Sequence, residues 1–253
     1  MGLLYAPCYK RMYGRRCGRG ASVDTVIYDG YTSTSGDYVF PLSKIHDKDG
    51  AAFFVQQVFD VFRSGREVCC EIGFGYGDYL FKLALANPDV IFIGFESYFP
   101  GIMSIYKMLN DTPLGNIYIY PGNVWDVLGL FPDRCILNLF MLYPDPWPRL
   151  RHHKRRMINS ESLSIFSSKL TDNGLILFLS DITSYVNSIH ELCMDIEDFI
   201  LLEHCNRLSS MFFSDTACRF EGFSYPEFYG TKFSLKADLA MRSSMSVVCR
   251  KCV

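Results

Sequence analysis

The sequence has no excess of charge of one sign and no long hydrophobic run. Its 253 residues carry a formal net charge of -2 at pH 7. Domains that bind nucleic acids are commonly basic, so any basic surface on this chain must be local. No apolar run approaches the length of about 20 residues that a membrane-spanning helix needs. The N-terminal residues also lack the apolar core of a secretory signal peptide. We therefore expect a cytoplasmic protein that does not bind membranes.

Cysteine patterns that would indicate disulfides or a metal site are also missing. The chain has 10 cysteines, but without a signal peptide we expect reduced thiols. The CxxC pair of Cys249 and Cys252 has no second pair, and it falls on an expected strand, where neighbouring side chains face opposite ways. It therefore predicts no metal site. Cys69 and Cys70 stand in an apolar run and are typical of a core.

The residues that are present predict a large buried core, since 49% are hydrophobic and 15% are aromatic. From residue 66 to 253, nearly continuous apolar runs alternate with helical periodicity, which predicts a doubly wound, Rossmann-like α/β sheet covered on both faces. The expected strands cover residues 67–74, 89–96, 116–120, 134–142, 174–181, 199–205 and 246–251. The expected helices cover residues 78–87, 101–110, 124–130, 161–170 and 183–196. Asn159 and Ser160 both fit as the N-cap of the helix from residue 161.

Residues 1–65 are predicted to form an N-terminal extension. It ends in a helix over residues 50–62, which have apolar residues at helical spacing. Its beginning is basic, with cationic side chains at Lys10, Arg11, Arg15, Arg16 and Arg19.

A glycine turn, "EIGFGYG", ends the first expected strand and includes Gly73, Gly75 and Gly77. Such glycines let a chain turn sharply and let a ligand approach the backbone. An ordinary tight turn is the simpler interpretation. The dinucleotide-binding pattern requires a small residue where Asp78 stands. Glu71 would be poorly placed beside a pyrophosphate, but it suits an ammonium group, such as the one at the methionine end of S-adenosylmethionine (SAM).

Two further polar residues follow the next two expected strands. Glu96 can accept hydrogen bonds from ribose hydroxyls, a role that NAD and SAM enzymes share. Asn123 can meet an adenine amino group or can cap the following short helix, and the two roles are compatible.

The stretch "YPDPWPRLRHHKRR", residues 143–156, follows the fourth expected strand. Its prolines make a stiff turn that holds Asp145 and offers Trp147 as a flat surface for a base. The basic residues then crowd together before a helix N-terminus, where positive charge is unfavourable. Binding of nucleic-acid phosphates explains this cluster better than local stability does. A solvated charged loop is the alternative.

These motifs, in this order and spacing, closely resemble the bacterial tRNA (guanine-N7-)-methyltransferases. "EIGFGYG", "FIGFESYFPG", "YPDPWPRLRHHKRR" and "LSDITSYV" carry the resemblance, which covers roughly residues 10–253. The family implies the seven-stranded sheet of class I SAM-dependent methyltransferases over residues 66–253. It also implies methyl transfer from SAM to N7 of guanosine 46 in the tRNA variable loop.

The resemblance also implies roles for individual residues. Asp145 is expected to be catalytic by positioning and electrostatics, because N7 carries no proton that a base must remove. The residues expected to bind SAM are Glu71, Gly73, Gly75, Gly77, Glu96, Asn123 and Asp145. The residues expected to bind the tRNA substrate are Arg149, Arg151, His152, His153, Lys154, Arg155, Arg156, Asp181, Thr231, Lys232 and Phe233.

The sequence departs from the family pattern at several positions. Asn123 replaces Asp, Arg149 replaces Lys, Ile182 replaces Trp, Tyr98-Phe99 replaces His, and Ser234 replaces Glu. The last change puts the base-contacting role of the C-terminal loop in question, and "CRFE", residues 218–221, is a second candidate for it.

We expect tRNA as the partner, no metal, no obligatory protein subunit, and a monomer or homodimer. Two rival functions remain, an NAD-linked oxidoreductase on a similar sheet and a non-catalytic RNA-binding protein that keeps the fold. Glu71, Asp78 and the basic stretch argue against the oxidoreductase.

Overall fold

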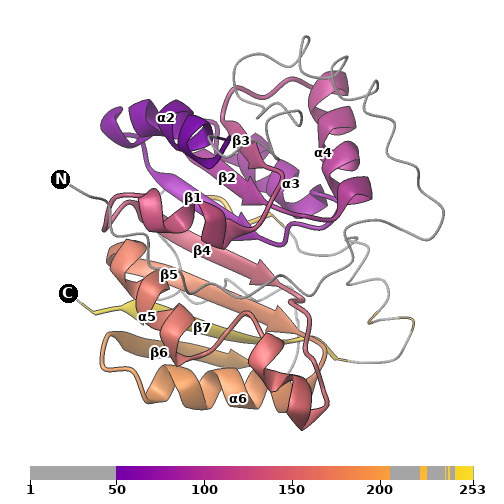
Figure 1. Ribbon diagram of the computed structural model, residues 1–253, viewed down its shortest axis with the longest axis vertical. Coiled ribbons are helices and arrows are strands. Elements are labelled where there is room, and N and C mark those ends of the chain that lie inside the picture. The colour runs from indigo at the N-terminus through magenta and orange to yellow at the C-terminus, as the bar shows by residue number, and fades with distance from the viewer. Residues whose placement is uncertain (1–49, 206–222, 227–236, 238, 240–242, 253) are drawn as a thin grey trace.

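Five parallel strands form the centre of a single sheet. The computed structural model describes residues 50–205, 223–226, 237, 239 and 243–252. Within them, seven strands pair in the order β3-β2-β1-β4-β5-β7-β6, with β7 antiparallel to both of its neighbours (Figure 1). The strands are β1 Val68–Ile72, β2 Ile91–Phe95, β3 Ile117–Tyr120, β4 Ile136–Leu142, β5 Leu170–Ser180, β6 Phe199–Cys205 and β7 Met245–Lys251. The predicted doubly wound sheet of seven strands is confirmed.

Helices connect the strands at the predicted places. The α-helices are α2 Gly50–Arg63, α3 Asp78–Ala86, α4 Phe99–Asp111, α5 Ser160–Lys169 and α6 Thr183–Met194. The 3₁₀-helices are η2 Val124–Asp126, η3 Leu128–Leu130 and η4 Leu150–Arg155. Two differences from the prediction concern short segments. The single helix expected over residues 124–130 is two 3₁₀ turns, and the basic segment, expected to be a loop, forms η4.

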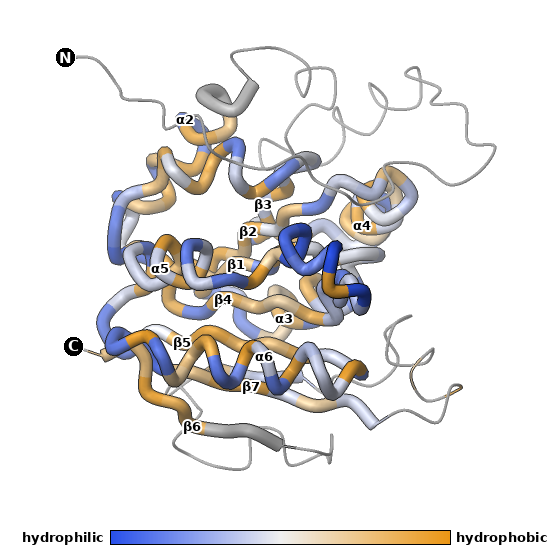
Figure 2. Tube along the Cα trace, turned by 60° about the horizontal axis from the view of Figure 1, so that its bottom comes forward, coloured by the Kyte–Doolittle hydropathy of each residue, from blue (hydrophilic) through white to orange (hydrophobic). Residues whose placement is uncertain are grey.

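The core lies on both faces of the sheet. Helices α2, α5 and α6 pack against one face, and α3 and α4 pack against the other. Every residue of β1, β2, β3 and β4 is buried, which explains why these strands read as unbroken apolar runs. Figure 2 shows the hydrophobic colour along the strands, while the covering helices alternate between hydrophobic and hydrophilic turns.

Helix α2 packs directly on this core, although it was predicted as the end of the extension over residues 1–65. Phe54, Val58 and Val61 of α2 are buried in the same cluster as Phe166 of α5. The basic group at residues 10–19 lies outside the described residues. The boundary between residues 65 and 66 therefore stays a prediction.

Helix α5 begins with a capping box that settles its N-cap. The Asn159 side chain accepts a hydrogen bond from the backbone N–H of Ser162 at 3.1 Å, and Ser162 Oγ accepts one from the N–H of Asn159 at 2.8 Å. Asn159, rather than Ser160, is the N-cap. The cationic residues of the basic segment end at Arg156, before this cap.

The described residues contain no membrane-spanning helix, disulfide or metal cluster. No helix there is long and apolar enough to cross a bilayer. The cysteines of the described ranges, Cys69, Cys70, Cys135, Cys193, Cys249 and Cys252, are free thiols. In this same part of the chain, no three His, Cys, Asp or Glu side chains are grouped to hold a metal ion.

The contact between α4 and the glycine turn leads to a prediction about Gly101. A Cβ atom at Gly101 would lie 1.9 Å from the carbonyl oxygen of Gly75, so Gly101→Ala must push α4 away from the turn. We expect this change to lower the free energy of unfolding by about 1–3 kcal/mol, measured by urea denaturation. Gly129→Ala is the control, since nothing lies within 4 Å of its Cβ position, and it should stay within about 0.5 kcal/mol. Equal effects of the two changes would contradict this packing.

Candidate active site

The carboxyl ends of the parallel strands bring most of the predicted site residues to one edge of the sheet. In Figure 1 the arrows of β1, β2, β3, β4 and β5 point toward this edge. The predicted residues at or just beyond these ends are Glu71, Gly73, Gly75 and Gly77 after β1, Glu96 after β2, Asn123 after β3, Asp145 after β4 and Asp181 after β5. Ligands of doubly wound sheets bind at this edge. Thr231, Lys232, Phe233, Ser234 and residues 218–221 lie outside the described residues.

The Glu96 carboxylate organises the glycine turn. Its Oε2 accepts a hydrogen bond from the N–H of Gly75 at 2.8 Å. Its Oε1 accepts hydrogen bonds from the N–H groups of Ser97 at 2.6 Å and Tyr98 at 2.8 Å. Burial raises the pKa of Glu96, and the hydrogen bonds from these backbone donors lower it. The effect of burial is the larger, so the pKa of Glu96 is raised. A carboxylate has about four lone-pair sites, so one remains for a ligand hydroxyl.

Glu71 is the most deeply buried acidic group of this edge. Glu71 is 2% exposed, and its Oε2 has no hydrogen-bond partner. Burial, followed by the nearby Glu96 and Asp78 carboxylates, raises the pKa of Glu71 to about 8. A buried acceptor without a donor is costly. An ammonium group placed beside Glu71 would supply the missing donor and a favourable charge, so the residues fit the methionine end of SAM.

Asn123 caps the short helix η2. Its Oδ1 accepts a hydrogen bond from the N–H of Trp125 at 3.2 Å. Trp125 in turn stacks on Phe166 of α5, with ring centroids 5.2 Å apart. The capping interpretation is therefore confirmed. The amide oxygen keeps a second lone pair, so the predicted contact with an adenine amino group remains compatible with the cap.

A tyrosine pair beside the glycine turn was not predicted. The hydroxyls of Tyr76 and Tyr98 lie 3.5 Å apart, and their rings meet edge to face with centroids 5.9 Å apart. Tyr76 lies between two glycines of the turn, and Tyr98 is the N-cap of α4. Tyr98 was noticed only as a departure from the family pattern. An aromatic residue between turn glycines is a weak signal, because its partner is far along the chain.

The turn that carries Asp145 has unusual backbone geometry. Tyr143 has a φ of 52° and Trp147 a φ of 39°, a region in which bulky residues are outliers. The N–H of Tyr143 donates to the carbonyl of Leu179 at 2.7 Å, which ties the turn to β5. Asp145 is exposed at the rim, yet the protein around its carboxyl group removes enough solvent to raise its pKa. Its charge also contributes to the raised pKa of Glu96.

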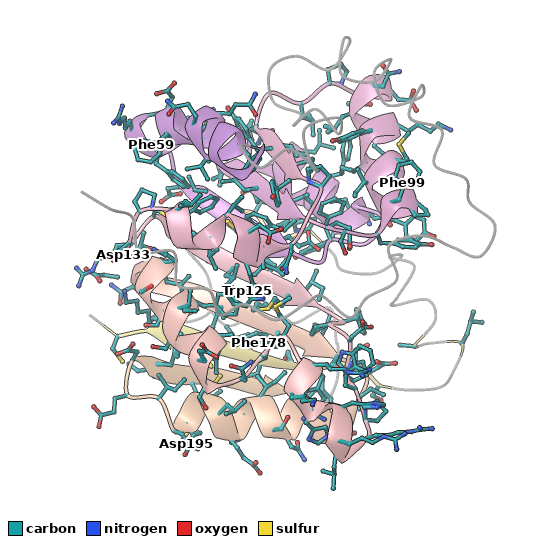
Figure 3. All side chains as sticks on the ribbon, in the orientation of Figure 1. Phe59, Phe99, Trp125, Asp133, Phe178 and Asp195 are labelled. Carbon is teal, nitrogen blue, oxygen red and sulfur yellow. The ribbon has the colours of Figure 1, made fainter. Side chains whose placement is uncertain are left out.

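The basic segment, residues 149–156, forms η4 and its two caps. Arg149, Arg151 and Lys154 are exposed. Figure 3 shows nitrogen-rich side chains gathered around the short helix that follows β4. The protein surroundings and then the neighbouring cations, Arg155 foremost, lower the pKa of His152.

Trp147 packs on this basic segment. The Arg155 guanidinium lies over its ring, 5.0 Å from the centroid, and the His152 ring meets it edge-on with centroids 5.8 Å apart. Trp147 was predicted to offer a flat surface to a base. Only the part of its ring that Arg155 leaves uncovered could have this role.

Arg156 differs from the exposed cations of the segment because its side chain contacts other parts of the protein. Its Nε donates to the carbonyl of Pro146 at 2.9 Å and its Nη1 donates to Ser188 Oγ at 3.0 Å. Its guanidinium carbon lies 4.6 Å from the centroid of the Tyr185 ring. The sequence resemblance implied a tRNA contact here, and it gave no sign of this internal use.

The strand order and the polar groups along this edge define a protein with the class I methyltransferase fold. A family model described as "Putative methyltransferase" matches residues 65–218, and the chain belongs to this family. The predicted family resemblance is confirmed. The matched residues include Glu71, Glu96, Asn123, Asp145 and the whole basic segment.

Similar proteins agree with this assignment. The chain is 30% identical over 208 residues to a bifunctional methyltransferase of Rickettsia felis, covering 81% of this chain and 36% of that protein. It is 35% identical over 127 residues to a tRNA (guanine-N(7)-)-methyltransferase of Jannaschia sp. strain CCS1, covering 50% of this chain and 54% of that protein. The chain thus spans about half or less of the length of these relatives. A solved 16S rRNA methyltransferase has the same fold, with a TM-score of 0.55, 15% identity, and coverage of 77% of this chain and 93% of that one.

The buried Glu71 carboxyl predicts a pH-dependent stability of the protein without ligand. Its pKa rises from an ordinary value of 4.5 to about 8 on folding, so the neutral form is favoured in the fold. The stability that it contributes is fully present below 4.5 and is lost as the pH rises through about 8. Glu71→Gln stays neutral, so it should match the unmutated protein at low pH and exceed it by a few kcal/mol above pH 8.

Urea denaturation across this pH range measures the difference. Glu67→Gln, which changes an exposed carboxylate beside β1, is the matched control for the lost charge and should not restore stability at high pH. If the free energies of unfolding of Glu71→Gln and of the unmutated protein change with pH in parallel, the buried carboxyl group is not the cause of the pH dependence.

Proposed function

We propose that this protein methylates N7 of guanosine 46 in the tRNA variable loop, using SAM as the methyl donor. The observation that carries the proposal is one arrangement at the carboxyl edge of the sheet. A buried carboxyl group whose Oε2 has no hydrogen-bond partner, that of Glu71, lies at the same edge as Asp145 and the exposed cations of η4. The motifs of residues 143–156 and the name of the Jannaschia relative, a tRNA (guanine-N(7)-)-methyltransferase, support the same substrate.

The residues of β1, β2 and β3 provide the parts of a SAM site. Bound SAM would supply an electrophilic methyl group. Glu71 would accept hydrogen bonds from its ammonium group, Glu96 from its ribose hydroxyls, and Asn123 from its adenine amino group. Gly73, Gly75 and Gly77 all have positive φ values, which favour glycine. Nothing lies within 4 Å of a Cβ position at Gly73, so a ligand could approach the backbone there.

Asp145 would act on the guanine without taking a proton. N7 presents an in-plane lone pair with no hydrogen, so the reaction needs alignment and charge stabilisation rather than a general base. Guanine becomes cationic as the methyl group arrives. An ionised carboxylate on a stiff, strained turn can hold the base and oppose that developing charge. Asp181, which directly follows the neighbouring β5, would also contact the substrate.

The exposed cations explain how a chain of net charge -2 would bind tRNA. Arg149, Arg151 and Lys154 can each neutralise a phosphate and release counterions. The positive charge is needed only along the path of the substrate. We further propose that no second protein subunit is required and that Thr231, Lys232 and Phe233 contribute to the substrate site.

Replacement of Asp145 separates catalysis from binding. We expect Asp145→Ala to lower methylation of unmodified tRNA by more than about 100-fold, while tRNA affinity, set by phosphates, stays within about two-fold. Incubation with labelled SAM measures the rate, and N7-specific strand cleavage maps the modified base. Asp111→Ala, an exposed carboxylate at the far end of α4, is the matched control and should keep full activity.

Three results would oppose the proposal. Absence of methylation by the unmutated protein, with tRNA still bound, would support a non-catalytic RNA-binding protein. A rise in melting temperature with NAD and none with SAM would support the oxidoreductase. If the modified guanosine lay at another position of the tRNA, the proposed N7 methylation would stand, but guanosine 46 would be wrong as its target.

A further inference from the structure

We infer that Arg156 is a positioning residue, which ties the turn carrying Asp145 to helix α6 and is not a phosphate contact of tRNA. The expected effect of Arg156 on methyl transfer rests on the proposed function. The bridge itself rests on contacts between described residues alone.

One side chain bridges two segments that lie far apart in the sequence. Arg156 Nε donates to the carbonyl of Pro146, the residue next to Asp145, at 2.9 Å. Its Nη1 donates to Oγ of Ser188 in α6 at 3.0 Å. Its guanidinium lies against the ring of Tyr185, also in α6. Arg156 therefore connects the segment after β4 with the segment after β5, and these segments carry Asp145 and Asp181.

The α6 side of this bridge is rigid. Tyr185 is 0% exposed and packs in the core. The Ser188 hydroxyl donates to the carbonyl of Tyr185 at 2.8 Å, so its oxygen is left to accept from Arg156. A guanidinium suits this place because its planar donors are fixed relative to one another and its face can stack on a ring. A lysine would provide a point charge without either property.

The turn needs an external support. Its prolines at positions 144, 146 and 148 have no N–H to donate, so the turn has few backbone hydrogen bonds of its own. Tyr143 and Trp147 have positive φ values, and such geometry persists only where surrounding contacts impose it. The hydrogen bond from Arg156 to Pro146 lies between these two residues and supplies such a contact.

Arg156 is also in a different environment from the exposed cations of the basic segment. Arg149, Arg151 and Lys154 are exposed, whereas Arg156 is half-buried. Burial lowers the pKa of Arg156. Two of its five N–H donors and one face of its guanidinium have partners within the protein, which fixes the orientation of the group between the turn and α6.

Steady-state kinetics and salt dependence distinguish the two roles. We expect Arg156→Lys, which keeps the charge, to lower kcat for tRNA about 10- to 100-fold because the turn is misplaced, with KM nearly unchanged. Arg156→Gln should lower kcat similarly and leave the slope of log Kd against log salt unchanged. Lys154→Gln, as the reference for a phosphate contact, should raise KM and reduce that slope by about one. A phosphate role for Arg156 predicts the opposite, with near-normal activity of Arg156→Lys and a reduced slope for Arg156→Gln.

A second variant tests the bridge without changing any charge. Ser188→Ala should lower kcat by a smaller factor than Arg156→Lys, and the double variant should lose less than the product of the two factors. Fully multiplicative effects would show that the two side chains act separately and would overturn the bridge.

Fluorescence of Trp147 provides a readout that does not depend on activity. The chain has 2 tryptophans, so Trp125→Phe leaves Trp147 as the only reporter. In that background we expect Arg156→Gln to increase acrylamide quenching, because the freed turn exposes the ring, while Lys154→Gln leaves quenching unchanged. Unchanged quenching in Arg156→Gln would overturn the positioning role even if tRNA is methylated. If the unmutated protein does not methylate tRNA, the proposed function fails while this measurement still tests the bridge.

Discussion

The parallel arrangement of the five strands β1, β2, β3, β4 and β5 is the constraint on which the whole site depends. Because the strands run the same way, their carboxyl ends meet along one edge, and each following turn contributes a polar group there. These turns are held in place because every residue of β1, β2, β3 and β4 is buried between helices on the two faces of the sheet. The Glu96 carboxylate then joins two of the turns by accepting from Gly75 as well as from its own turn. The positions of the ligand-binding groups are thus consequences of the sheet.

Much of this arrangement could be predicted from the sequence. Strands covered on both faces are unbroken apolar runs, and helices between them end at recognisable signals such as Asn87-Pro88. These features are local. The seven-stranded order and the placement of Glu71, Glu96, Asn123 and Asp145 follow from the alternation of strands and helices, together with the family resemblance. The choice of Asn159 as N-cap was left open because neighbouring residues offered similar chemistry.

Features that depend on contacts across the chain could not be predicted. Arg156 looks like its basic neighbours in the sequence, and its partner Ser188 is a common polar residue in a helix. The pairing of Tyr76 with Tyr98 has the same cause, because only the folded chain brings the turn to the N-terminus of α4. The basic segment was predicted as one phosphate-binding unit. Only the folded chain separates the exposed Arg149, Arg151 and Lys154 from Arg156, which contacts Ser188 and Tyr185 of α6.

The carboxylates at the edge of the sheet make a site suited to positive charge. Burial raises the pKa of Glu71, Glu96 and Asp145, and neighbouring carboxylates raise the pKa of Glu71 and Glu96 further. Without a cationic ligand, Glu71 holds a proton near neutral pH, since its pKa is about 8. A bound ammonium group would favour its ionised form. In the proposed reaction one positive charge moves from the sulfonium of the methyl donor to guanine, and the Asp145 carboxylate would stand beside the guanine that receives it. The protein therefore need not reorganise its charges as the methyl group moves, which is the property that electrostatic catalysis requires of a site.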